Sequence, residues 1–189
     1  MDGFLSLASA KNKLRDRQYE EATRMFEQIL KRDMGGAAEA AYCLGIIYHT
    51  GSGVPKDVDE AERYYNLARH SGHTMATYRL AGIFQRRGDA RKAYDFYRTI
   101  APINPSASYW AYRMLAENES LDQAQDAGER YLSAAAEQGH VLAQRVVALK
   151  YASGKMGLVH VPLGIVMLAR NAFNIIMTVA IRHDRMKYK

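Results

Sequence analysis

The sequence predicts an all-α fold, an α/α solenoid in which antiparallel helix pairs stack into a superhelix. Within residues 38–73, two apolar patterns of helical period flank a turn that contains two glycines. A weaker copy of this layout follows, and its Ala81 lies 36 residues after Gly45. A repeat period of this length is typical of stacked helix pairs, which usually provide a binding surface.

The composition suits one array of short repeats. The chain has 189 residues, of which 48% are hydrophobic, and it has room for about four or five repeats. Cys43 is the only cysteine and falls within an apolar helical pattern, so we expect a buried thiol and a reducing compartment. The first residues carry Asp2 and lack a basic region before a long apolar run, so no secretory signal is expected. These features predict a cytoplasmic location.

The net charge is unevenly distributed along the chain. Of the total of +6, the residues from Leu158 onward carry +4, which leaves +2 for the preceding 157 residues. Nucleic acid binding along a repeat array needs a continuous basic surface. We therefore expect no nucleic-acid partner.

The helices of residues 38–73 follow from their residue pattern. In the first helix Leu44 and Tyr48 share one face, beside Gly45, where a neighbouring helix can come close. The turn uses glycines at positions 51 and 53, and Asp57 suits the start of the second helix. Gly72 is placed to end that helix. The second helix repeats small and aromatic residues at i, i+3, i+4 and i+7, namely Ala61, Tyr64, Tyr65 and Ala68.

This segment closely resembles a Sel1-like repeat, a relative of the tetratricopeptide repeat. The matching residues are Ala40, Leu44, Gly45, Tyr48, Gly51, Gly53, Val54, Asp57, Ala61, Tyr64, Tyr65, Ala68, Gly72 and His73. The resemblance implies a superhelix of antiparallel helix pairs that acts as a protein-interaction scaffold.

The other repeats match less closely. Residues 17–30 resemble the second helix of a tetratricopeptide repeat, and residues 78–97 and 109–140 resemble whole repeats, although Gly128 stands where alanine is expected. We therefore expect a Sel1-like and tetratricopeptide-like repeat domain over residues 1–157. Spacings of 36, 35 and 32 residues result if four small residues are equivalent: Gly45, Ala81, Ala116 and Ala148.

The candidate binding residues lie on the first helix of each pair, because these helices line the concave side of such arrays. Aromatic and arginine side chains dominate protein-binding hot spots. Counted from the small residues, the groove would contain Tyr42, Ile46, His49, Tyr78, Gln85, Arg86, Trp110 and Arg113. The alternative is that these side chains only pack the repeats and the groove is merely solvated.

No catalytic site or cofactor site is expected. No serine lies in a nucleophile elbow, and Cys43 has no obvious histidine partner. The turn at residues 51–57 lacks the Gly-Lys-Ser/Thr ending of a phosphate-binding loop. The sequence therefore predicts a protein that is not an enzyme.

The histidines are predicted to be structural. His70 and His73 are three residues apart, but Gly72 lies between them and no further ligands complete a metal site. His73 and His140 occupy equivalent positions at repeat junctions. This equivalence predicts a structural hydrogen bond at each junction.

Residues 158–189 depart from the repeat pattern and predict a hydrophobic, basic closing helix that Pro162 can begin. Arg170 and nearby asparagines interrupt it, so it is a poor transmembrane span. Its broad apolar face needs a cover, and three interpretations remain open: packing on a fifth repeat that opens at Ala143, burial against another copy or a different protein, or insertion at a membrane surface. The residues that would contact a partner or membrane are Phe173, Ile176, Arg182 and Arg185.

The functional hypothesis is an adapter that binds a protein partner in the concave groove. The resemblance implies a role in bacterial cell-envelope or exopolysaccharide assembly. The alternative is a peripheral membrane protein at the inner face of a membrane, anchored by its C-terminal helix and using the repeats as a spacer.

Overall fold

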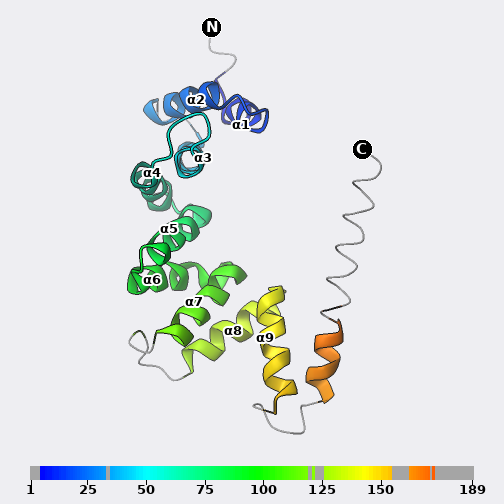
Figure 1. The fold of residues 1–189 in the computed structure, drawn as a ribbon. Coiled ribbons are helices and arrows are strands. Elements are labelled where there is room, and N and C mark those ends of the chain that lie inside the picture. Colours follow the sequence, from blue (N-terminus) through cyan, green and yellow to red (C-terminus); the bar gives the residue numbers. More distant parts are fainter. Residues whose placement is uncertain are drawn as a thin grey trace, which may run out of the picture. The chain divides into compact units, whose positions relative to one another are not determined.

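The computed structural model describes residues 5–32, 35–118, 121, 126–154, 162–170 and 172. Within these ranges the chain forms helices and turns and no strand, so the predicted all-α class is confirmed. A further helix, without a label in Figure 1, covers residues 162–170. The labelled helices are α1 (Leu7–Arg15), α2 (Tyr19–Lys31), α3 (Ala37–Thr50), α4 (Val58–His70), α5 (Thr74–Arg86), α6 (Ala90–Ile100), α7 (Pro105–Glu117), α8 (Ala127–Glu137) and α9 (Val141–Ala152), with a short 3-10 turn at Ala101–Ile103.

The chain divides into two compact units, residues 1–100 and 101–189. The first unit contains α1 to α6 and the second contains α7 to α9 with residues 162–170. The boundary expected after residue 157 stays a prediction, because residues 155–161 lie outside the described ranges.

The first unit is a row of three helix hairpins, drawn from blue to green in Figure 1. The hairpins are α1–α2, α3–α4 and α5–α6, and neighbouring hairpins touch through α2 with α3 and α4 with α5. Phe26, Ile29 and Leu44 belong to one buried cluster, which joins the first two hairpins. Tyr65 and Leu80 belong to a second cluster, which joins the second and third. Each hairpin therefore shares its core with the next one, as in a stacked repeat.

The close approach of α3 and α4 depends on Gly45. A Cβ atom at this position would lie 2.5 Å from Cδ1 of Tyr65. Tyr65 is 1% exposed, so its ring has no free space into which to move. The ring occupies the volume that a side chain at position 45 would need, which confirms the close contact that the sequence predicted.

We expect Gly45→Ala to lower the free energy of unfolding by about 1–3 kcal/mol, because the added methyl overpacks the Tyr65 ring. Gly82→Ala in α5 is the matched control. Its Cβ would meet no atom closer than 3.7 Å, so the higher helix propensity of alanine should raise stability by about 0.5–1 kcal/mol. Urea unfolding followed by circular dichroism measures both values. Equal effects of the two substitutions would contradict the proposed packing.

Three helices of the two units begin with the same type of cap. His73, Asn104 and His140 precede α5, α7 and α9, and each side chain accepts the backbone N–H of the third residue of its helix, at 3.2, 3.0 and 3.3 Å respectively. In each histidine the acceptor is Nδ1. The structural hydrogen bonds predicted for the two histidines are thus confirmed, and they satisfy N–H groups that a helix start leaves unpaired.

These caps correct the repeat register of the fourth repeat. Asn104 lies 31 residues after His73 and 36 before His140, so Tyr112, one helical turn earlier than Ala116, is equivalent to Ala81. Ala116 is exposed and makes no close helix contact of the expected kind. Tyr112 lies opposite Gly128 of α8, where an added Cβ would be 3.8 Å from its Cδ2. Gly128 takes the place of Ala61, since each lies 12 residues before its histidine cap, so a larger residue on α7 faces a smaller one on α8, which accounts for glycine in place of the expected alanine.

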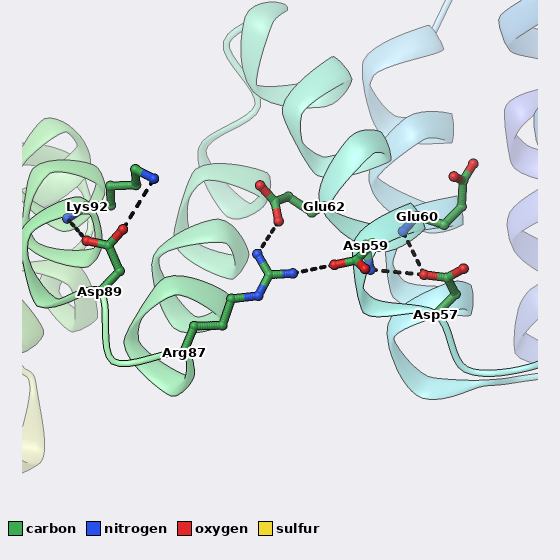
Figure 2. Close-up of polar contacts among 7 residues, drawn as sticks. All are labelled: Asp57, Asp59, Glu60, Glu62, Arg87, Asp89 and Lys92. Atoms are coloured by element: carbon green, nitrogen blue, oxygen red, sulfur yellow. Dashed lines mark hydrogen bonds and ion pairs between the residues drawn. The ribbon is translucent and has the colours of Figure 1, made fainter.

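A polar cluster fastens the end of α5 to α4 (Figure 2). Arg87 directly follows α5 and donates through Nη1 to Glu62 Oε2 at 2.5 Å and through Nη2 to Asp59 Oδ1 at 2.6 Å. Asp57 caps α4 by accepting two backbone N–H groups, as its position in the sequence predicted. Asp89 accepts the backbone N–H of Lys92 at the start of α6. The cluster orients the third hairpin on the second.

The helix at residues 162–170 packs on α9 through Gly164. A Cβ atom here would lie 2.8 Å from the carbonyl oxygen of Ala148, so only glycine permits this backbone approach. Pro162 is the first residue of the helix, as predicted. Leu163, Ile165 and Val166 nevertheless stay 50%, 58% and 63% exposed. One edge of the helix is therefore covered by the fifth repeat and its apolar side chains remain accessible.

Candidate functional site

The predicted binding residues of the first unit lie on α3 and α5, the first helices of their hairpins, which contact each other. All are half-buried except Arg86, which is exposed. The exposed Arg79 lies one turn from Gly82 and two turns from Arg86 on α5. The α3/α5 face is defined here by Tyr42, Ile46, His49, Tyr78, Arg79, Gln85 and Arg86.

One hydrogen bond joins the two helices at this face. Nη2 of Arg86 lies 3.0 Å from Nε2 of His49. A guanidinium group can only donate, so Nε2 accepts and Nδ1 carries the ring proton. Nδ1 is buried and has no hydrogen-bond partner among the described residues. The structure thus brings together two residues that the sequence analysis selected from different repeats.

Positive charge dominates the surroundings of His49. Burial lowers the pKa of the His49 imidazole, and the nearby charges of Arg86, Arg79 and Lys56 lower it further. In the part of the chain that the structure describes, no carboxylate forms an ion pair with any of these three cations. His49 is therefore uncharged at pH 7, and the cations near it have no carboxylate partner among the described residues.

Tyr42 is held in place by a histidine of the next repeat. Its ring stacks on His73 with centroids 4.4 Å apart. Nε2 of His73 donates to Oε2 of Glu39 at 2.8 Å, and Nζ of Lys11 lies 2.6 Å from the other carboxylate oxygen. The hydrogen bond from Lys11 is the main reason that the pKa of Glu39 is lowered. The only carboxylate of α3 is thus already neutralised.

Three of the predicted residues have internal partners. Gln85 accepts a hydrogen bond from the hydroxyl of Tyr97 at 3.1 Å. The ring of Tyr78 meets the same tyrosine edge-on, with centroids 5.6 Å apart. Ile46 packs against the buried cluster that contains Tyr65. Part of each side chain therefore serves repeat packing, the alternative that the sequence analysis left open.

The predicted residues of the second unit form a separate pair on α7. The guanidinium carbon of Arg113 lies 5.5 Å from the ring centroid of Trp110, a cation–π contact. Arg113 also donates through Nε to Glu117 at 2.6 Å. In the corrected register Trp110 is equivalent to Arg79, and Glu117 to Arg86. The fourth repeat therefore does not continue the basic character of α5.

Two cations that act on His49 were not among the predicted residues. Arg79 was missed although it lies seven residues before Arg86, a spacing that places both on one side of a helix. Lys56 was missed because it belongs to the turn after α3. The remaining predicted contacts, Phe173, Ile176, Arg182 and Arg185, lie outside the described residues.

The described residues contain no grouping suited to metal binding or nucleophilic catalysis that we can identify. No three His, Cys, Asp or Glu side chains in this part of the chain are placed to hold a metal ion. Cys43 is 4% exposed, and burial raises the pKa of its thiol to about 11, which disfavours the reactive thiolate. Of the helices described, none has the length and apolarity needed to cross a bilayer.

Comparison with known proteins identifies the repeats. The Sel1 repeat family model matches residues 38–73 and 111–140. Chitin synthase regulatory factor 4 of Schizosaccharomyces pombe is 27% identical over 97 residues, which are 51% of this chain and 15% of that protein. The chain thus corresponds to a small part of this relative.

Solved structures share the fold. The crystal structure of a Sel1 repeat protein from Oxalobacter formigenes aligns with a TM-score of 0.68 and 21% identity, over 79% of this chain and 62% of that one. A second structure is that of c5321, a protective antigen of uropathogenic Escherichia coli strains that displays an SLR (Sel1-like repeat) fold. It aligns with a TM-score of 0.62 and 19% identity, over 79% of this chain and 33% of that one.

The chain therefore contains Sel1 repeats at residues 38–73 and 111–140, and it has an all-α solenoid fold. Sel1 repeats generally mediate protein–protein interactions, and their fold is typically a non-catalytic scaffold.

The pKa of His49 provides a test of the face. The pKa of His49 is lower in the folded chain than in the unfolded chain, where it is about 6.5. As pH falls through 6.5, the unfolded chain therefore binds more protons than the folded chain. The contribution of His49 to the stability of the fold is present above that pH and is lost below it. We expect Arg86→Gln to raise the His49 pKa by removing a neighbouring cation. NMR titration of the imidazole signals measures this shift. Arg91→Gln, at an exposed position of α6, should leave the pKa unchanged, and an equal shift in both variants would refute the assignment.

Proposed function

We propose that the protein is a non-catalytic adapter that holds a protein partner on the α3/α5 face. The observation that carries this proposal is the bond between Arg86 and His49, which joins two repeats into one surface. Half-exposed tyrosines at positions 42 and 78 lie on the same two helices, about two turns from His49 and Arg86, and they are the kind of side chain that contributes most to protein binding. The general role of Sel1 repeats in protein–protein interaction supports the same conclusion.

The proposed setting is the assembly or regulation of a cell-envelope polysaccharide. The resemblance of the repeats implied a bacterial envelope or exopolysaccharide role. The name of the fission yeast relative associates that protein with the regulation of chitin synthase, an enzyme that makes a structural polysaccharide. In this setting an adapter would hold a protein of the synthetic machinery.

We expect the combined Tyr42→Ala and Tyr78→Ala variant to lose capture of at least one partner in an affinity pull-down. Truncation of aromatic residues at a binding hot spot costs about 2 kcal/mol or more, roughly a 30-fold loss of affinity. Tyr94→Ala, on α6, is the control that should retain capture. An unchanged capture profile from a variant with a native circular dichroism spectrum would refute the proposed face.

A second candidate function, attachment to a membrane surface, is favoured by the exposed apolar side chains of residues 162–170. Ile165 and Val166 are the most exposed of them, at 58% and 63%. The sequence beyond them adds basic residues that would favour anionic head groups.

If the membrane candidate is correct, the full chain should float with vesicles of phosphatidylcholine and phosphatidylserine. The Ile165→Asp and Val166→Asp double variant should then remain in the soluble fraction, because each charge opposes insertion into the apolar layer. Leu67→Asp, at an apolar position of α4 that is 49% exposed, should float like the wild type. Failure of the wild type to float would leave the adapter function alone.

A further inference from the structure

The first helices of the three hairpins in the first unit, α1, α3 and α5, contain one carboxylate between them. The thirteen residues of α5 include two arginines and no carboxylate. The single carboxylate of α3, Glu39, is bound by Lys11 and His73. The second helix of the same hairpin, α4, carries three carboxylates, Asp59, Glu60 and Glu62. The α3/α5 face therefore repels a basic partner and attracts an acidic one.

The distance between the two arginines of α5 determines the spacing that a bound partner has to match. Arg79 and Arg86 are seven residues apart, two helical turns, so their positions are displaced by about 10 Å along the helix axis. An extended peptide in the polyproline II conformation has three residues per turn, so side chains three residues apart lie on one face and are separated by about 9 Å. This spacing is close to the one between the two arginines.

Arg86 is oriented before any partner binds. Its bond to Nε2 of His49 uses one of its five N–H donors and leaves others for a carboxylate. Arg79 is exposed, and among the described residues it has no ion-pair partner to give up. Lys56 is exposed beside them and adds to the positive potential around His49. Binding an anion here would remove repulsion between cations in addition to forming new contacts.

We propose that the α3/α5 face selects an extended acidic segment of a partner protein, with two carboxylate side chains three residues apart that pair with Arg79 and Arg86. This proposal rests on the adapter function and specifies its partner. An extended peptide fits better than a nucleic acid, because the fourth repeat has Trp110 and Glu117 at the equivalent positions. The basic stretch thus lacks the repeat-to-repeat continuation that a phosphate backbone would need.

The probe is a fluorescein-labelled peptide of ten residues with glutamates at its fourth and seventh positions in a glycine and serine background. We expect it to bind the full chain in fluorescence anisotropy at low salt and to shift the imidazole signals of His49 in NMR spectra. Exposed ion pairs are individually weak. The double variant Arg79→Gln and Arg86→Gln should therefore raise the Kd about three- to tenfold, and Arg91→Gln should leave it unchanged.

The matched peptide with glutamine at both positions lacks the same two ion pairs and should bind about three- to tenfold more weakly than the glutamate peptide. The proposal is overturned if that peptide binds equally well, if Arg91→Gln weakens binding as much as the double variant, or if neither peptide binds. Tighter binding of a single-stranded oligonucleotide, with the same dependence on Arg79 and Arg86, would assign the face to nucleic acid instead.

The adapter function can survive the failure of this proposal. If a captured partner depends on Tyr42 and Tyr78 but not on Arg79 and Arg86, the face binds protein without selecting acidic segments. If capture is unaffected by the aromatic substitutions as well, the adapter function on this face fails.

Discussion

The packing of an aromatic ring against a glycine is the constraint that sets how closely the helices approach in two of the hairpins. Where α3 meets α4, Gly45 leaves the volume that the buried Tyr65 ring fills. In the fourth repeat the same problem is solved with the roles reversed, since Tyr112 of α7 faces Gly128 of α8. Because a hairpin interface is close-packed, only the combined volume of the two positions is fixed. This accounts for the different positions of the glycine in the second and the fourth repeat.

Successive hairpins are joined by polar and aromatic contacts that also prepare the candidate face. His73 caps α5 through one ring nitrogen and binds Glu39 of α3 through the other, while Tyr42 stacks on its ring. The consecutive residues Arg86 and Arg87 then bind different helices, α3 and α4, at the end of α5. The contacts that fix the third repeat on the second are thus the ones that bring His49 to an arginine. In this unit, therefore, the same contacts fix the stacking of the repeats and form the candidate binding surface.

The positive charge of the α3/α5 face follows from the positions and the partners of the nearby carboxylates. Those of α4 lie at its start or bind Arg87, and the one on α3 binds Lys11. None of the described carboxylates is left for the arginines of α5, which makes the face basic within a repeat body of low net charge. A local excess of positive charge can select an acidic partner, and the net charge of the whole chain does not reveal this excess. The apolar surface on residues 162–170 is a different kind of surface, in the other unit, and calls for a different partner or a lipid layer.

The local pattern determined the hairpins, their glycine turns, the buried cysteine and the structural histidines, because each depends on residues within a repeat or at its junction. It also selected His49 and Arg86 as candidate site residues. It failed where a choice depended on contacts between helices. The register of α7 was placed one turn too late, since alanine at position 116 satisfied the pattern whereas the equivalent position holds Tyr112, which lies against Gly128. Only the tertiary structure decided that Gln85 bonds inward, that Arg79 belongs to the face and that Gly164 lies on α9. The physical reason is that a helical period fixes the direction of a side chain, whereas its partner is set by the packing of a second helix.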